Sequence, residues 1–72
     1  MSKKDYIKFA EMFAEEHGKC SIDNPAECAA VNTIVFKTAK IFHYDNPAFR
    51  PYQFFQACGY GKEEAGTMEA RI

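Results

Sequence analysis

Pro25–His43, which reads PAECAAVNTIVFKTAKIFH, decides the fold of this chain. It contains no glycine and no proline after Pro25, and Asp23 or Asn24 can cap a helix that has Pro25 at its first position. The part from Val31 to Val35 is rich in β-branched residues, which are common in strands. However, the length of the run and the lack of a two-residue alternation favour a helix. We therefore predict a long helix over 25–43.

A second, amphipathic helix is predicted over 3–17, before the long one. Its apolar residues recur at helical spacing on one face, and lysines and glutamates occupy the other. Ser2 is a good N-cap residue, and Asp5 can complete a variant capping box with it. Gly18 is typical of the residue that follows a helix. Met12 falls on the polar side of this helix and is expected to be exposed.

The remainder of the chain predicts one short helix and a tail. Asn46-Pro47 ends the long helix, because a residue before proline disfavours the α conformation. A third helix is predicted from Pro51 to Gly59, and 60–72 has glycine breaks and little apolar periodicity. The sequence thus predicts an all-α, three-helix domain over 1–59 with a flexible tail over 60–72. The residues expected to pack together in its core are Phe9, Phe13, Val31, Val35, Phe42, Phe49, Phe54 and Phe55.

Composition narrows the class of protein. The chain has 72 residues, 47% hydrophobic and 15% aromatic, which predicts one folded domain. A formal net charge of −1 gives no general attraction to nucleic acid. There is no apolar run of membrane-spanning length and no apolar leader, so no membrane association is expected. Three cysteines, an odd number, argue against a disulfide framework and predict free thiols in a reducing cytoplasm.

The sequence gives only weak signals for a metal site or a catalytic site. Zinc favours a histidine and cysteine ligand set, which His17, Cys20, Cys28 and Cys58 could supply. No Cys-x-x-Cys pair is present, and Cys28 and Cys58 fall on apolar faces, where cysteine acts as a small hydrophobic residue. A Cys58 nucleophile paired with His43 or His17 lacks an orienting third residue. We therefore predict no catalytic residue, no metal and no cofactor, and a protein that is not an enzyme.

The long helix carries more apolar surface than two short neighbours would cover. Its apolar residues spread around most of the helix circumference, which is typical of a partner-binding surface. The expected partner is a foreign protein or a second copy of the chain, which would complete the core of a homodimer. The residues predicted to bind the partner are Ile34, Phe36, Lys37, Lys40, Ile41, Tyr44, Arg50 and Tyr52.

A nucleic-acid-associated regulatory protein is the alternative. Lys37, Lys40 and Arg50, together with Tyr44 and Tyr52, could form a modest basic and aromatic patch. Proteins that bind single-stranded nucleic acid combine basic residues with stacking rings. This alternative requires the three cations to lie together on one surface.

Short motifs at both ends of the helical region resemble a group of small phage and prophage proteins. They are Lys4-Asp5-Tyr6-Ile7 with Ala10, and Asp45-Asn46-Pro47-Ala48-Phe49 followed by Phe54 or Phe55 and by Ala57-Cys58-Gly59. Members of that group read Lys-Asp-Tyr…Ala and Asn-Pro-x-Phe-Asp-x-x-x-Phe-x-x-Ala-Cys-Gly. The resemblance covers about 4–59, and Arg50 stands where the group usually has aspartate.

The resemblance implies a function in the host cell. Most of these phage proteins have no assigned activity, and small phage proteins often act stoichiometrically by binding a host protein. The resemblance therefore implies a non-enzymatic binding protein in the host cytoplasm, such as an inhibitor of a CRISPR effector or of another host enzyme.

Overall fold

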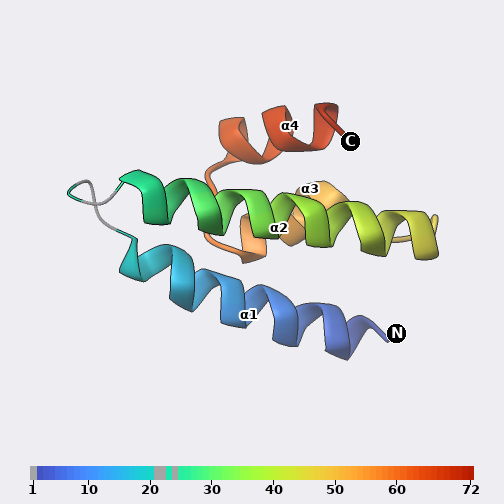
Figure 1. Ribbon diagram of the computed structural model, residues 1–72. Coiled ribbons are helices and arrows are strands. Elements are labelled where there is room, and N and C mark those ends of the chain that lie inside the picture. The colour runs from blue at the N-terminus through green and yellow to red at the C-terminus, as the bar shows by residue number, and fades with distance from the viewer. Residues whose placement is uncertain (1, 21–22, 24) are drawn as a thin grey trace.

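The computed structural model describes residues 2–20, 23 and 25–72, and the regular structure in these ranges is entirely helical. Four helices follow one another, namely α1 (Lys3–Lys19), α2 (Pro25–Asp45), α3 (Pro51–Ala57) and α4 (Lys62–Ala70) (Figure 1). The predicted all-α fold class is confirmed. The predicted number of three helices is wrong, because the expected tail forms a fourth.

Helix α1 begins as its sequence predicts and ends later. The backbone N–H of Ser2 donates to the Oδ2 atom of Asp5 at 2.9 Å, the reach-back hydrogen bond of a capping box. This hydrogen bond is the main reason why the pKa of Asp5 is lowered. The helix continues through Gly18 to Lys19, whose Nζ atom lies 3.6 Å from Glu15 and 3.5 Å from Glu16. These exposed pairs modestly favour the two residues by which the helix exceeds its predicted end.

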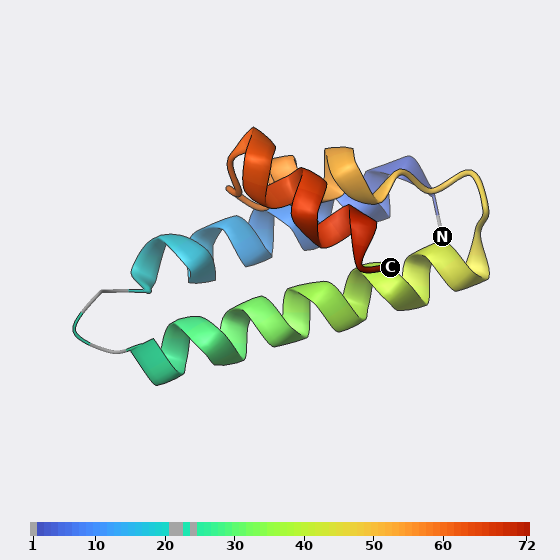
Figure 2. The same cartoon turned by 90° about the horizontal axis from the view of Figure 1, so that it is seen from above.

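Helices α1 and α2 form an antiparallel pair (Figures 1 and 2). The 21 residues of α2 make it the longest element, and it ends at Asp45, just before Asn46-Pro47. The Oδ1 atom of Asn46 accepts a hydrogen bond from the backbone N–H of Ala48 at 3.0 Å, which stabilises the turn toward α3. The predicted end of the long helix near residue 43 is thus confirmed to within two residues.

Gly59 ends the third helix in a Schellman motif. The backbone N–H of Gly59 donates to the carbonyl of Gln56 at 3.0 Å, and that of Tyr60 donates to the carbonyl of Phe55 at 3.1 Å. Gly59 has a φ of 102°, which an L side chain rarely adopts. The predicted helix end at Gly59 is confirmed, and the turn directs the chain back toward α1 and α2.

The flexible tail predicted over 60–72 is wrong. Helix α4 packs mainly against α3, and both Tyr60 and Ala65 are buried. Met68 of α4 and Ile72, which follows the end of the helix, also pack against the core. The carboxylate of Glu69 accepts a hydrogen bond from the backbone N–H of Tyr52 at 3.3 Å. The chain is therefore structured to its last residues, and the folded unit extends beyond the predicted limit at residue 59.

The core is a cluster of aromatic rings between α1, α2 and α3. The ring of Phe42 lies 5.3 Å from Phe9, 5.5 Å from Phe49 and 5.7 Å from Phe54, all in edge-to-face arrangements. The ring of Phe13 also contacts Phe54, at 6.3 Å. Such pairs stabilise a fold by about 0.5–1.5 kcal/mol each beyond the area they bury. The predicted core is confirmed for Phe13, Phe42, Phe49, Phe54 and Phe55, but it is wrong for Phe9, which touches Phe42 and is still 38% exposed.

Candidate functional site

The eight residues predicted to bind a partner lie on different sides of the molecule. Ile34 and Ile41 are exposed on α2, with relative exposures of 55% and 66%. Phe36 is instead half-buried, and its ring stacks on that of Phe55 at 6.4 Å. Because residues two positions apart in a helix point in nearly opposite directions, Ile34 and Phe36 belong to opposite edges of α2.

The Phe36 edge of α2 faces α4. The Nζ atom of Lys40 and the guanidinium of Arg71 lie over the ring of Phe36, at 5.8 and 5.6 Å from its centroid. Lys37 lines a groove of about 580 Å³ between α2 and α4, together with Arg71 and two glutamates of α4. Phe36 and Lys40 are therefore engaged within the fold, and the groove carries charges of both signs.

Tyr44, Arg50 and Tyr52 also lie apart from one another. Tyr44 is almost fully exposed, at 93%, near the end of α2. Arg50 is exposed and lines a groove between α1 and α3, whereas Tyr52 is half-buried close to α4. The structure thus places Lys37 and Arg50 in two different grooves, and the single basic and aromatic patch that the nucleic-acid alternative requires is not formed by them.

Four large apolar side chains lie exposed on one side of α1 and α2, and we call this set the outer face. Its members are Phe9, Met12, Ile34 and Ile41, with relative exposures of 38%, 47%, 55% and 66%. The predicted exposure of Met12 is confirmed, whereas Phe9, predicted as a core residue, is also part of this exposed surface. The position of Met12 on the polar side of its helix was the only signal that α1 contributes to an exposed apolar surface.

Helix geometry explains why these four side chains share a face. The contact between Phe9 and Phe42 at one end and the Cys20–Cys28 disulfide at the other fix the register of the antiparallel pair. Ile34 and Ile41 are two turns apart on the edge of α2 opposite Phe36, and Met12 follows Phe9 by about one turn of α1. The outer face therefore follows the seam between α1 and α2, away from α3 and α4.

A second candidate surface is the groove between α1 and α3, which we call the basic groove. It encloses about 370 Å³ and includes Lys3, Ile7 and Arg50 among the residues that line it. Ile7 has a relative exposure of 47%. Because Ile7 and Phe9 point in nearly opposite directions from α1, the basic groove and the outer face are separate surfaces.

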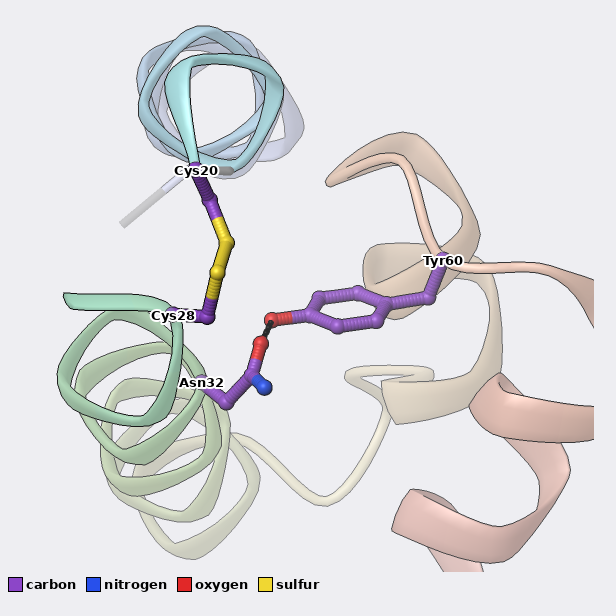
Figure 3. The surroundings of a disulfide bond; sticks show 4 residues. All are labelled: Cys20, Cys28, Asn32 and Tyr60. Carbon is purple, nitrogen blue, oxygen red and sulfur yellow. Dashed lines mark hydrogen bonds between the residues drawn. A yellow bond between two sulfur atoms is a disulfide. The ribbon is translucent and has the colours of Figure 1, made fainter. Parts of the chain in front are cut away.

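A disulfide closes the end of the α1–α2 pair. Cys20 directly follows α1 and Cys28 lies in the first turn of α2, with their Cα atoms 5.2 Å apart (Figure 3). The expectation of free thiols is wrong for these two residues. Since that expectation was the basis for a reducing compartment, two of the three cysteines no longer support it.

Tyr60 connects the segment after α3 to the disulfide end. Its hydroxyl donates a hydrogen bond to the Oδ1 atom of Asn32, one turn after Cys28 (Figure 3). The imidazole of His17 stacks on the ring of Tyr60 with the centroids 4.4 Å apart. His17, considered above as a zinc ligand or a base, therefore packs as an aromatic ring at this junction.

Burial raises the pKa of Tyr60 from its ordinary 10.0 to about 12, with smaller contributions from Cys58 and Glu64. The folded state therefore holds the phenol proton more tightly than the unfolded state. Its contribution to stability is complete below pH 10.0 and is lost as the pH rises through about 12. In a tyrosinate absorbance titration, we expect one of the four tyrosines to ionise about two pH units late. Tyr60→Phe should remove this late step, and ionisation of every tyrosine near pH 10 would contradict it.

Cys58 is fully buried, and burial raises the pKa of its thiol to about 12. A thiol with such a pKa is almost wholly protonated at neutral pH and is a poor nucleophile. Cys20 and Cys28 are consumed by the disulfide, so they are unavailable as thiolate ligands. Within the ranges that the structure describes, no group of three or more His, Cys, Asp or Glu side chains is placed to hold a metal ion.

Comparison with known proteins places the chain in no family. No protein-family model matches it, and neither curated proteins nor solved structures give a match. Among the described helices, none is both long enough and apolar enough to cross a membrane.

Proposed function

We propose that this chain is a non-enzymatic protein-binding module that binds its partner through the outer face. The observation that carries the proposal is the exposure of four large apolar side chains along one seam. Single exposed apolar residues are normal on a protein surface, whereas contiguous ones from two helices are typical of interaction sites. Aromatic residues and methionine are also enriched in interfaces.

The partner that we propose is a host protein, bound stoichiometrically in the host cytoplasm. This part of the proposal is supported by the resemblance of the Lys4–Ile7 and Asp45–Gly59 motifs to phage proteins. An inhibitor of a host defence enzyme, such as a CRISPR effector, would act by covering a surface of its target. The outer face presents side chains that insert into a groove of a partner in the manner of i, i+3 and i+7 helix anchors.

A homodimer is the second candidate, because the same apolar seam can bury itself against a copy. In such a dimer, Ile34 and Ile41 of both copies would lie in the same interface, related by a two-fold axis. Sedimentation analysis of the purified chain separates the two candidates. A monomer favours a foreign partner, and a dimer that Ile41→Glu dissociates favours self-association.

The test of the proposed function compares two substitutions that add the same charge. Ile41→Glu places it on the outer face, while Ala70→Glu places it at the exposed end of α4, away from the outer face and the basic groove. We expect the wild type to retain one bacterial host protein in near-equal amount, and Ile41→Glu to weaken this complex roughly tenfold or more. Calorimetric titration of the purified complex measures the change. Equal affinity of wild type and Ile41→Glu for the retained protein would contradict the proposal.

A further inference from the structure

We infer that the basic groove binds an acidic segment of a partner protein, with an apolar side chain in the groove and carboxylates at Lys3 and Arg50. The inference rests on the proposed protein-binding function and adds the chemistry of one contact. A groove of about 370 Å³ lies in the range of sites that enclose a few side chains. Three segments that are distant in the chain build it, namely helix α1, the turn that follows α2, and helix α3.

The floor of the basic groove is apolar and held in place. The ring of Tyr6 lies 5.0 Å from Phe42 and 4.8 Å from Phe49, so it packs against the aromatic core from the groove side. Its hydroxyl accepts a hydrogen bond from the Nδ2 atom of Asn46 at 3.4 Å. Ile7 is half-exposed above this floor. A surface held by core packing is already formed before binding, which lowers the entropic cost of association.

The charges around the basic groove have one sign. Lys3 and Arg50 line it, and no aspartate or glutamate is among its lining residues in the described part of the chain. Neither cation forms an ion pair with a described acidic side chain. The groove between α2 and α4 differs, because glutamates of α4 accompany its cations. The basic groove therefore selects an anionic partner, and its apolar floor selects an apolar side chain beside the anion.

Arginine suits this role because its planar guanidinium can hold a carboxylate with two parallel hydrogen bonds. Arg50 stands directly before Pro51, whose ring fixes the backbone at the start of α3. Its side chain is exposed, while the neighbouring Phe49 and Pro51 are buried. The fold thus anchors both neighbours of Arg50 in the interior and presents the cation at the groove.

The experiment measures binding of a short labelled peptide to the full-length chain by fluorescence anisotropy. The peptide alternates leucine with glutamate, and two matched peptides replace either glutamate by lysine or leucine by serine. We expect only the acidic, leucine-containing peptide to bind. Its affinity should fall about tenfold in Arg50→Gln, which loses a charge-assisted contact. It should also fall between about 50 mM and 500 mM salt, because screening weakens exposed charge pairs.

Ile7→Glu should abolish peptide binding, whereas Ile41→Glu and Lys4→Gln should preserve it. Binding of the lysine peptide with equal affinity, or indifference to Ile7→Glu, would overturn the inference. Tighter binding of the aliphatic carboxylate dodecanoate than of the peptide at this groove would also overturn it, in favour of a small-molecule ligand. If the peptide does not bind while Ile41→Glu still disrupts the host complex, the inference fails and the proposed function stands.

Discussion

Replacing both Cys20 and Cys28 by serine is expected to lower the free energy of unfolding by about 2–3 kcal/mol relative to the oxidised chain. The two cysteines are eight positions apart, so the bridge closes a short loop and restricts the unfolded ensemble by a correspondingly modest amount. For a domain of this size, the loss lowers Tm by roughly 10–20 °C. Urea and thermal denaturation followed by circular dichroism measure both quantities.

Thiol counting provides the control for the disulfide prediction. In the oxidised chain, a thiol reagent should detect no cysteine while the protein is folded and one in denaturant, because Cys58 is buried and Cys20 and Cys28 are joined. Reduction of the wild type should reproduce the stability of the double variant, and the double variant itself should be insensitive to reductant. Equal stability of the double variant and the oxidised wild type would contradict the prediction.

Because of the disulfide, the stability of the folded chain depends on whether its compartment is oxidising or reducing. Loss of the bridge frees the end of the α1–α2 pair, where Tyr60 contacts both helices through His17 and Asn32. In a reducing cytoplasm, the two thiols stay reduced, and this end then relies on the tyrosine contacts. The proposed host cytoplasm would therefore present the less stable, dithiol form of the protein.

The positions of the cysteines in the sequence are compatible with the bridge between Cys20 and Cys28. An odd number of cysteines excludes complete pairing, but it permits one bridge and one buried thiol. Cys20 follows the first helix and Cys28 begins the second, so an antiparallel arrangement of the two helices brings them together. The burial of Cys58 agrees with its predicted place on an apolar helix face, whereas Cys28, predicted on such a face too, forms the bridge.

Helix α4 was missed because Ala65, its buried residue, is small and is followed by a glycine. Ala65 is fully buried, and an alanine contributes little to a pattern of hydrophobic periodicity. A Cβ atom at Gly66 would lie 4.0 Å from the ring of Tyr52, so the glycine sits beside α3 and does not break the helix. Ala65, Met68 and Ile72 have helical spacing, but only contact with α3 makes such a weak pattern decisive.

The candidate surfaces could be predicted only in part from the sequence, because they also depend on tertiary packing. The apolar excess on the long helix was visible in the sequence, and the exposure of Ile34 and Ile41 agrees with it. A single helix could not show that Phe36 lies under α4, nor that Phe9 and Met12 continue the surface of the isoleucines. These features depend on the position of each neighbouring helix around α2, which no local pattern specifies.

Phe55→Ala is expected to be the most destabilising single substitution that we consider, with a loss of about 3–5 kcal/mol in the free energy of unfolding. Phe55 is fully buried, and its ring contacts Phe36 of α2 at 6.4 Å, Phe54 at 6.1 Å and Tyr60 at 6.3 Å. Its removal leaves a cavity where α2, α3 and the segment before α4 meet. Domains of this size have little stability in reserve, so the variant should be largely unfolded at 37 °C.

Tyr44→Ala is the matched aromatic control for Phe55→Ala, because it removes a ring that is 93% exposed. It should change stability by no more than about 0.5 kcal/mol. If Phe55→Ala does not fold at all, Phe55→Leu should show a smaller, measurable loss in urea denaturation, since it fills part of the cavity. A loss below about 1 kcal/mol for Phe55→Ala would contradict the packing described here. It would mean that Tyr60 and α4 do not close over α3, which is the arrangement of the flexible tail predicted for 60–72.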